Sequence, residues 1–133
     1  YNAAGLGLPI VMTIGNRAIG APINIWNDHT DSMSMRDAGW IQLYAETNQE
    51  AADLHIQAFR LAEELSMPVM VCVDGFILTH AYERLDIPTQ AQVDAYLPPF
   101  QPLHRLDTAH VESWGNVVSQ DMFYRHRVNR HHC

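Results

Sequence analysis

The sequence predicts an α/β fold, a three-layer sandwich built around a mainly parallel sheet. Short apolar runs bounded by glycine, proline or polar residues are typical of strands covered on both faces. A longer run with apolar residues at intervals of three and four is typical of a helix that packs on such a sheet. The strands are predicted at residues 8–14, 22–27, 40–45 and 69–74, and the helix at 48–65.

The first part of the chain supplies two of these strands. The chain starts at Tyr1 without an initiator methionine, and an apolar run follows almost at once, so we expect an excised piece of a longer polypeptide. Pro9 suits the start of the first strand, because no ladder donor is lost there. After the second strand, Asp31 or Ser32 is expected to cap a short helical turn that Gly39 terminates.

The middle of the chain predicts a β–α–β unit. Thr47 and Glu50 have the spacing of a capping box, in which each side chain satisfies a free backbone amide at the start of a helix. Pro68 sets the end of that helix, because the residue before a proline is disfavoured in helical conformation. The strands on either side should pair in parallel through a right-handed crossover.

The last third of the chain is predicted to be looser. Four prolines between residues 86 and 104 predict an extended arm or interdomain linker, with a helical turn at 89–96. Residues 120–133 predict an amphipathic helix, whose terminal histidines and cysteine we interpret as exposed residues rather than a soft-metal site. We therefore divide the chain into part of one domain and an arm with a tail, residues 1–85 and 86–133.

Composition excludes several classes of function. The chain has 133 residues, of which 47% are hydrophobic, as in a globular domain, and its net charge of -7 argues against a nucleic-acid partner. No apolar run approaches about eighteen residues and no basic signal region opens the chain, so we expect no membrane segment and a cytoplasmic protein. Cys72 is predicted to act as a small hydrophobe, not in a disulfide. The absence of a glycine-rich phosphate loop, a GxSxG elbow and a CxxC pair argues against P-loop, serine-hydrolase and iron–sulfur chemistry in this chain.

A candidate site follows the second predicted strand. The polar cluster of residues 27–31 stands where ligands bind in α/β sheets, beyond the carboxyl end of a strand. Arg17 is isolated between two apolar runs, and a buried guanidinium is costly unless it meets an anion. The residues alone favour a salt bridge from Arg17 to Asp28 or Asp31 over a bound ligand. Asp28, His29 and Asp31 have metal-binding side chains, but we favour loop hydrogen bonding and predict no metal site.

Landmark residues over about residues 8–100 occur in an order that resembles one family. They are Asn16-Arg17-Ala18, Ala21 to His29, Asp31-Ser32-Met33, Arg36-Asp37, Gly39-Trp40, Asn48 to Asp53 and Asp74-Gly75-Phe76. The pattern is similar to the α chain, or first domain, of the 2-oxoacid:ferredoxin oxidoreductases, most closely the pyruvate type.

The resemblance implies a fold and a set of site residues. The fold is the thiamine diphosphate-binding type, and residues 1–85 match the C-terminal part of its pyrimidine-binding domain, so the sheet is expected to be incomplete at its N-terminal side. The resemblance implies that Arg17 binds the carboxylate of a 2-oxoacid substrate. It also implies that this chain has no catalytic residue and no metal ligand. The acidic residue that contacts the pyrimidine of the cofactor in the family has no counterpart in this chain. The implied pocket wall consists of Asn27, Asp28, His29 and Asp31.

The resemblance further implies a larger enzyme. That enzyme oxidatively decarboxylates a 2-oxoacid, expected to be pyruvate, to an acyl-CoA with coenzyme A, and passes electrons to ferredoxin or flavodoxin. Thiamine diphosphate, Mg²⁺ and 4Fe-4S clusters are expected mostly in other chains or domains, such as the β, γ and δ subunits. We expect an oligomer, and a chain that is inactive alone. The alternative is a noncatalytic α/β module for binding or subunit assembly.

Overall fold

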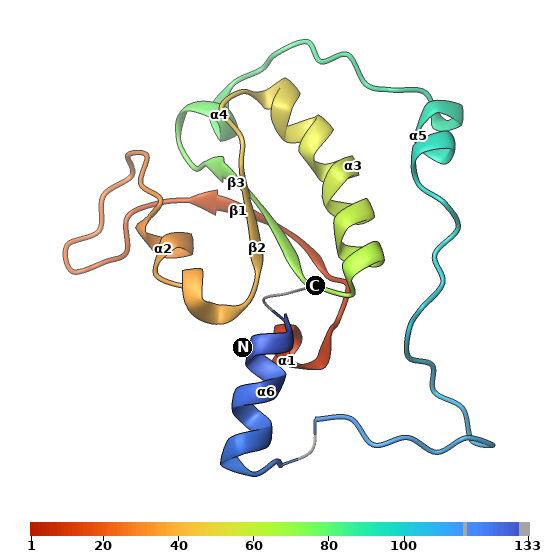
Figure 1. The fold of residues 1–133 in the computed structure, drawn as a ribbon. Helices are drawn as coiled ribbons and strands as arrows, with labels where there is room; N and C mark the ends of the chain where they lie inside the picture. Colours follow the sequence, from red (N-terminus) through yellow and green to blue (C-terminus); the bar gives the residue numbers. More distant parts are fainter. Residues whose placement is uncertain (116, 131–133) are drawn as a thin grey trace.

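The computed structural model describes residues 1–115 and 117–130. Within these residues a parallel sheet has the strand order β1-β3-β2, which confirms the α/β fold class (Figure 1). The strands are β1 (Val11–Asn16), β2 (Ile41–Tyr44) and β3 (Val69–Asp74). The helices are α1 (Asn2–Leu6), α2 (Thr30–Met33), the short 3-10 helix η1 (Arg36–Ala38), α3 (Asn48–Leu65), α4 (Ile77–His80), α5 (Gln90–Tyr96) and α6 (Gln120–Arg130).

Strand β3 is the centre of the core. All six of its residues are buried, and it pairs in parallel with β1 on one side and β2 on the other. Successive side chains of a strand point to opposite faces. Val69 and Val71 point to the face covered by α3, where they pack against Ala58 and Ala62. Cys72 therefore points to the other face, and the small alanines let α3 lie close to the strands.

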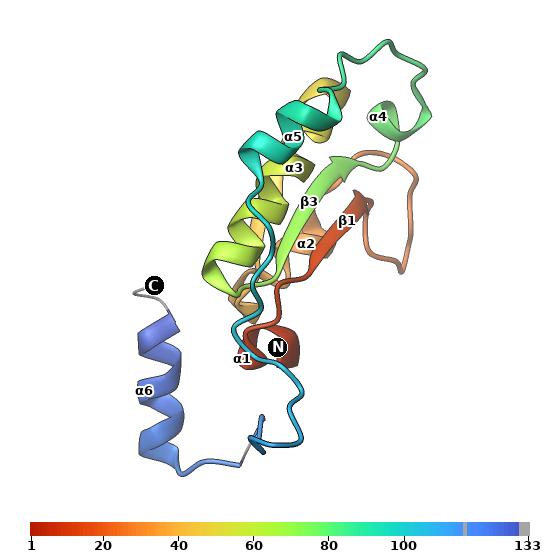
Figure 2. The same cartoon turned by 90° about the vertical axis from the view of Figure 1, so that its right-hand side faces the viewer.

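Helix α3 has the bounds that the sequence predicts and lies along one side of β1 and β3 (Figure 2). The hydroxyl oxygen of Thr47 accepts a hydrogen bond from the Glu50 amide at 3.1 Å. The Glu50 carboxylate reaches back as well, but to the amide of Glu46, at 2.7 Å. The bond from the Glu50 amide to Thr47 is thus confirmed. The returning bond of the Glu50 carboxylate is made to the residue before the cap, not to the Thr47 amide.

The two crossovers of the sheet lie on opposite faces. The chain passes from β1 to β2 through α2, and returns from β2 to β3 through α3. In the order β1-β3-β2, the connection from β1 to β2 and the connection from β2 to β3 run across the sheet in opposite directions. Two crossovers of the same handedness therefore lie on opposite faces of the sheet. Accordingly, Ser32 of α2 contacts Asn16 and Tyr44 on the face turned away from α3. The layers are α2, the sheet and α3.

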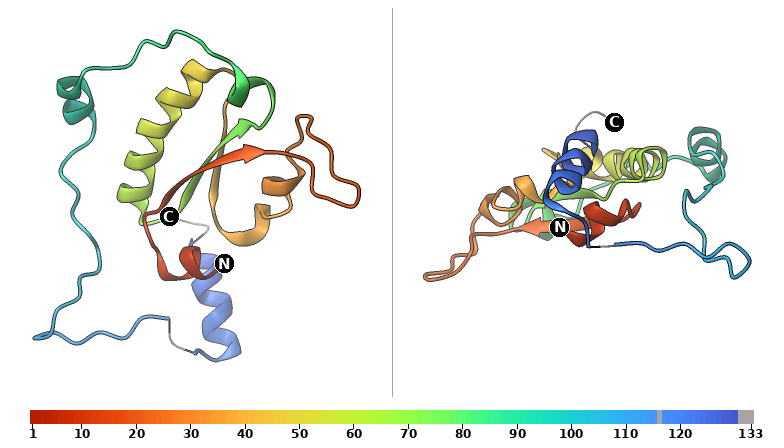
Figure 3. Two further views of the ribbon diagram at one scale, coloured as in Figure 1. Left: turned by 180° about the vertical axis from the view of Figure 1, so that it is seen from behind. Right: turned by 60° about the horizontal axis from the view of Figure 1, so that its bottom comes forward.

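Residues 22–27 do not form a strand, and the prediction there is wrong. They belong to a long loop between β1 and α2 that projects from the sheet (Figure 3). Ile23, Ile25 and Trp26 are 71%, 55% and 62% exposed, so their apolar side chains do not line a core. The Asn24 side chain accepts a hydrogen bond from the Trp26 amide at 3.0 Å, a local bond that replaces a strand ladder.

Other boundaries differ by a few residues. The first strand begins at Val11 rather than at residue 8, because the Leu8 amide bonds the carbonyl of Ala3 at 3.1 Å and completes the turn after α1. Helices α1 and α4 were not predicted. Neither carries an apolar periodicity, since each is only four or five residues long.

The predicted helical turn before Gly39 is present in two pieces, α2 and η1. Asp31 and Ser32 lie inside α2, so the prediction that one of them caps the turn is wrong. The Asp28 carboxylate instead accepts a hydrogen bond from the Thr30 amide at 2.6 Å. Gly39 ends η1 in the left-handed region, with φ of 85°, as predicted.

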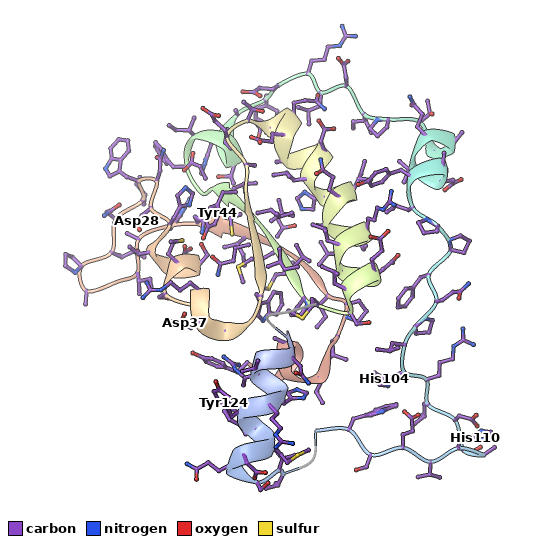
Figure 4. All side chains as sticks on the ribbon, viewed as in Figure 1. Asp28, Asp37, Tyr44, His104, His110 and Tyr124 are labelled. Atoms are coloured by element: carbon purple, nitrogen blue, oxygen red, sulfur yellow. The ribbon has the colours of Figure 1, made fainter. Side chains whose placement is uncertain are left out.

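The arm and tail surround this core loosely. Helix α5 forms within the predicted turn and lies beside α3, where the Arg60 guanidinium stands 4.8 Å from the centre of the Tyr96 ring. The chain then runs past His104 and His110 to α6, beside α1 (Figures 1 and 4). Residues 120–130 are helical as predicted, but their apolar side chains are largely exposed and do not gather on one face, so the predicted amphipathic character is not present. His131, His132 and Cys133 lie outside the described residues.

The cap of α3 yields a first prediction. We expect Thr47→Ala to lower the free energy of unfolding by about 1 kcal/mol, because it removes the acceptor for the Glu50 amide. Amide hydrogen exchange in the first turn of α3 measures this loss in place. Thr89→Ala is the matched control, since Thr89 caps α5, which buries no residue. Equal effects of the two substitutions on α3 would contradict the prediction.

The outer edge of β1 yields a second prediction. Among the described residues β1 pairs only with β3, so its other edge has no strand partner, and such edges tend to pair with another chain. We expect this chain to self-associate when it is alone, or to pair with a companion chain when one is present. Size-exclusion chromatography with light scattering measures the mass across a dilution series. A monodisperse monomer at all concentrations is the contrary result.

Candidate functional site

The candidate site lies at the carboxyl ends of β1 and β3. The last residues of these strands, Asn16 and Asp74, are register partners. The Gly75 amide donates to the Asn16 carbonyl at 2.9 Å, which extends the parallel pairing one residue beyond the strands. Arg17 follows β1 directly, so its side chain starts beside Gly75. Ligands of parallel sheets bind at this end of the strands.

Gly75 makes room for the Arg17 side chain. A Cβ atom on Gly75 would lie 2.8 Å from Cγ of Arg17 and closer still to the carbonyl oxygen of Asn16. A Cβ atom essentially never lies this close to a non-bonded atom, so only glycine fits here without a shift of the backbone. In the space that results, Nε of Arg17 donates to the Gly75 carbonyl at 3.0 Å.

Asp31 holds the main chain at the same point. Its Oδ2 accepts from the Arg17 amide at 3.0 Å, and its Oδ1 accepts from the side-chain amide of Asn16 at 2.6 Å. The amide of Ser32 also donates to Oδ1, at 2.7 Å. The carboxylate of Asp31 therefore ties the end of β1 to α2.

The guanidinium of Arg17 keeps two nitrogens open. In the described part of the chain, Nη1 and Nη2 have no hydrogen bond and no ion pair, and the salt bridge to Asp28 or Asp31 that the residues alone favoured is not formed. The side chain is half-buried and fixed at Nε. Two parallel N–H donors in one plane match the two oxygens of a carboxylate.

The other predicted wall residues lie in the loop before α2. The Asp28 carboxylate accepts from the hydroxyl and the amide of Thr30, and these bonds lower the pKa of Asp28. The loop bonds are thus kept until the pH falls below the ordinary range of a carboxyl pKa. The His29 ring packs edge-on against Tyr44 of β2, with ring centres 4.9 Å apart, and Asn27 is exposed. Figure 4 labels Asp28 in this loop and Tyr44 on the strand.

The turn after β3 contributes groups that sequence reasoning did not assign to the site. The buried Asp74 carboxylate accepts from the amides of Phe76, Ile77 and Leu78, which fixes the turn into α4. The Phe76 ring meets Trp26 edge-on, with ring centres 4.9 Å apart, and so links this turn to the projecting loop. The available signals were the position of Asp74-Gly75-Phe76 directly at a strand end and its place among the residues that carry the family resemblance.

A polar cluster lies beneath α2. The Ser32 hydroxyl contacts the side-chain amide of Asn16 at 2.8 Å and the Tyr44 hydroxyl at 3.0 Å. Burial raises the pKa of Tyr44 and of the nearby Cys72 thiol, so both stay neutral at ordinary pH. Cys72 is free and fully buried, as its predicted role requires. The cluster supports the end of β1 from below.

Residues 1–115 and 117–130 contain neither a metal-binding cluster nor a helix that could span a membrane. No group of three or more histidine, cysteine, aspartate or glutamate side chains in that part is arranged to hold a metal ion. The helices of the same part are all too short or too polar to cross a membrane.

The family that matches this chain and the names of its relatives agree with one another. Residues 1–133 match the family described as pyruvate flavodoxin/ferredoxin oxidoreductase, thiamine diphosphate-binding. The chain is 48% identical to pyruvate synthase subunit PorA of Methanosarcina barkeri over 96% of its length, and 56% identical to that of Pyrococcus furiosus over 89%. It is 44% identical, over 98% of its length, to ketoisovalerate oxidoreductase subunit VorA of Pyrococcus abyssi. These alignments cover 32%, 31% and 34% of the relatives, so the chain spans about a third of their length.

Proposed function

The chain belongs to the pyruvate flavodoxin/ferredoxin oxidoreductase family, in its thiamine diphosphate-binding domain, and from this premise we propose that it is part of a 2-oxoacid:ferredoxin oxidoreductase. The enzyme oxidatively decarboxylates a 2-oxoacid to an acyl-CoA. This piece contributes the wall of the pocket that holds the substrate. Relatives named as pyruvate synthase and ketoisovalerate oxidoreductase subunits support the reaction class.

The open guanidinium of Arg17 is the observation that carries the proposal. Its Nε is occupied by the Gly75 carbonyl, and its two terminal nitrogens stand at the strand ends with no partner in the described residues. A 2-oxoacid presents a planar carboxylate beside its ketone. Arg17 pairs with that carboxylate through both terminal nitrogens and thereby fixes the orientation of the ketone.

The acids of the site support a division of the cofactors between chains or domains. Asp28, Asp31 and Asp74 each accept hydrogen bonds from backbone amides, so their carboxylates are engaged in holding loops. Mg²⁺, the diphosphate and the pyrimidine of the cofactor are then held mostly by other parts of the enzyme, as are the 4Fe-4S clusters. When bound, thiamine diphosphate supplies the stabilisation of the carbanion that decarboxylation leaves.

Pyruvate is the substrate that most of the relatives' names favour, and the name of the VorA relative points to a branched 2-oxoacid. Both compounds carry the same carboxylate, so contact with Arg17 serves either. The proposed partners are the β, γ and δ subunits or the remaining domains, coenzyme A, and ferredoxin or flavodoxin. The proposal places the oligomeric enzyme in the cytoplasm.

The division of the cofactors yields a third prediction. We expect this chain alone, supplied with pyruvate, thiamine diphosphate and Mg²⁺, not to reduce a viologen acceptor, because its acids at the strand ends are engaged by the backbone. Reconstitution with the rest of the enzyme should restore the reduction. Turnover by the chain alone, followed by viologen absorbance, would overturn the division.

Arg17 yields a fourth prediction. A charge-assisted hydrogen-bonded contact contributes about 1.5–3 kcal/mol, so Arg17→Ala in the intact enzyme should lower kcat/KM for the 2-oxoacid by roughly ten- to a hundredfold. Arg17→Lys should recover only part of this loss, because lysine keeps the charge but lacks the planar pair of donors. Steady-state kinetics measures both effects, with folding checked by circular dichroism.

Arg84→Ala is the matched control for Arg17, since Arg84 is exposed in the segment between α4 and α5. It removes the same positive charge and should leave kcat/KM unchanged. If folded Arg17→Ala and Arg17→Lys enzymes keep the native kcat/KM, Arg17 has a structural role only.

A further inference from the structure

We infer that Gly75 and Asp31 are positioning residues for Arg17: they hold its side chain and main chain so that only the two terminal nitrogens face the substrate. The inference rests on the proposed function, because it assigns their role through the contact of Arg17 with the 2-oxoacid carboxylate. Neither residue touches the substrate itself.

Gly75 acts on the side chain. Arginine has many rotamers, and a guanidinium that must bind a carboxylate at a set angle gains from being fixed in advance. Because Gly75 has no Cβ, Cγ of Arg17 can occupy the space beside it. The Gly75 carbonyl accepts a hydrogen bond from Nε of Arg17 at 3.0 Å. Because Nε already donates to the Gly75 carbonyl, an anion can bind only at Nη1 and Nη2.

Asp31 acts on the main chain. Its carboxylate bonds the Arg17 amide at 3.0 Å and the Asn16 side chain at 2.6 Å, so the backbone is fixed where it leaves β1. It comes from α2, whereas Gly75 comes from the turn after β3. Arg17 is thus held from two elements at two separate atoms, and loss of either hold lets the guanidinium move.

The test is a pair of double-mutant cycles in the intact enzyme. Gly75→Ala and Asp31→Asn are each made alone and together with Arg17→Ala. Misplacing a substrate-binding group is costly, so we expect Gly75→Ala to lower kcat/KM for the 2-oxoacid by roughly tenfold, chiefly through KM, and Asp31→Asn by roughly threefold. In the Arg17→Ala background each should have less than about a twofold effect, since residues that act through one another are not additive.

Gly5→Ala is the control for adding a methyl group at a glycine. A Cβ there meets no atom within 4 Å, and its site in α1 accepts alanine well. The substitution should leave both KM and kcat at native values. If Gly75→Ala prevents folding, Asp31→Asn decides the inference, because asparagine has nearly the same volume and only exchanges one acceptor oxygen for a donor.

The outcomes separate this inference from the proposed function. If Arg17→Ala weakens substrate use but Gly75→Ala and Asp31→Asn leave it unchanged, or add their full effects to that of Arg17→Ala, the positioning role is refuted and the function stands. If Arg17→Ala itself has no effect, the proposed substrate contact is refuted. Effects of Gly75→Ala and Asp31→Asn that vanish in the Arg17→Ala background support the inference.

Discussion

The geometry of the site depends on one backbone hydrogen bond, from the Gly75 amide to the Asn16 carbonyl, at 2.9 Å. It continues the parallel pairing of β1 and β3 past the last strand residues. As a result, the residue after β1 and the turn after β3 lie against each other although 58 positions separate them. A side chain at position 75, directly after β3, would prevent this approach, so Gly75 and the arginine that lies against it form one unit.

The two faces of the sheet have different roles because their side chains differ. The face under α3 is lined by valines and alanines, which gives a core that excludes water and fixes the strands. The face under α2 is lined by Asn16, Gln42 and Tyr44, which hydrogen-bond one another or Ser32 and Asp31, with the buried Cys72 among them. Apolar packing positions the strands in general, and the directional polar bonds set where β1 ends and which way Arg17 leaves it.

The sequence correctly predicted the helices and strands whose ends are determined by neighbouring residues in the chain. The bounds of α3 follow from Thr47, Glu50 and Pro68, and those of β3 from an unbroken apolar run, so both were correct. The run at 22–27 has the same composition as a strand, but an exposed loop held by the Asn24 side chain and the Trp26–Phe76 contact also accommodates it. The resemblance named Arg17, yet its bond to Gly75 depends on strand order and register, which spacing along the chain does not contain. The division at residue 85 and the roles of Asn27 and His29 stay predictions.

Among the residues that the structure describes, the hydrogen bonds that hold Arg17 come from within residues 16–75, and the described part of the arm and tail contributes none of them. The open edge of β1 faces away from β3 on the outside of the sheet. On the proposed function, the part of the pocket that takes the substrate carboxylate is therefore arranged by the strands and α2 themselves. Since its donors are already fixed, this half loses little conformational freedom on binding. The same proposal assigns the cofactor half to another part of the enzyme, which can supply it without rearrangement of Arg17.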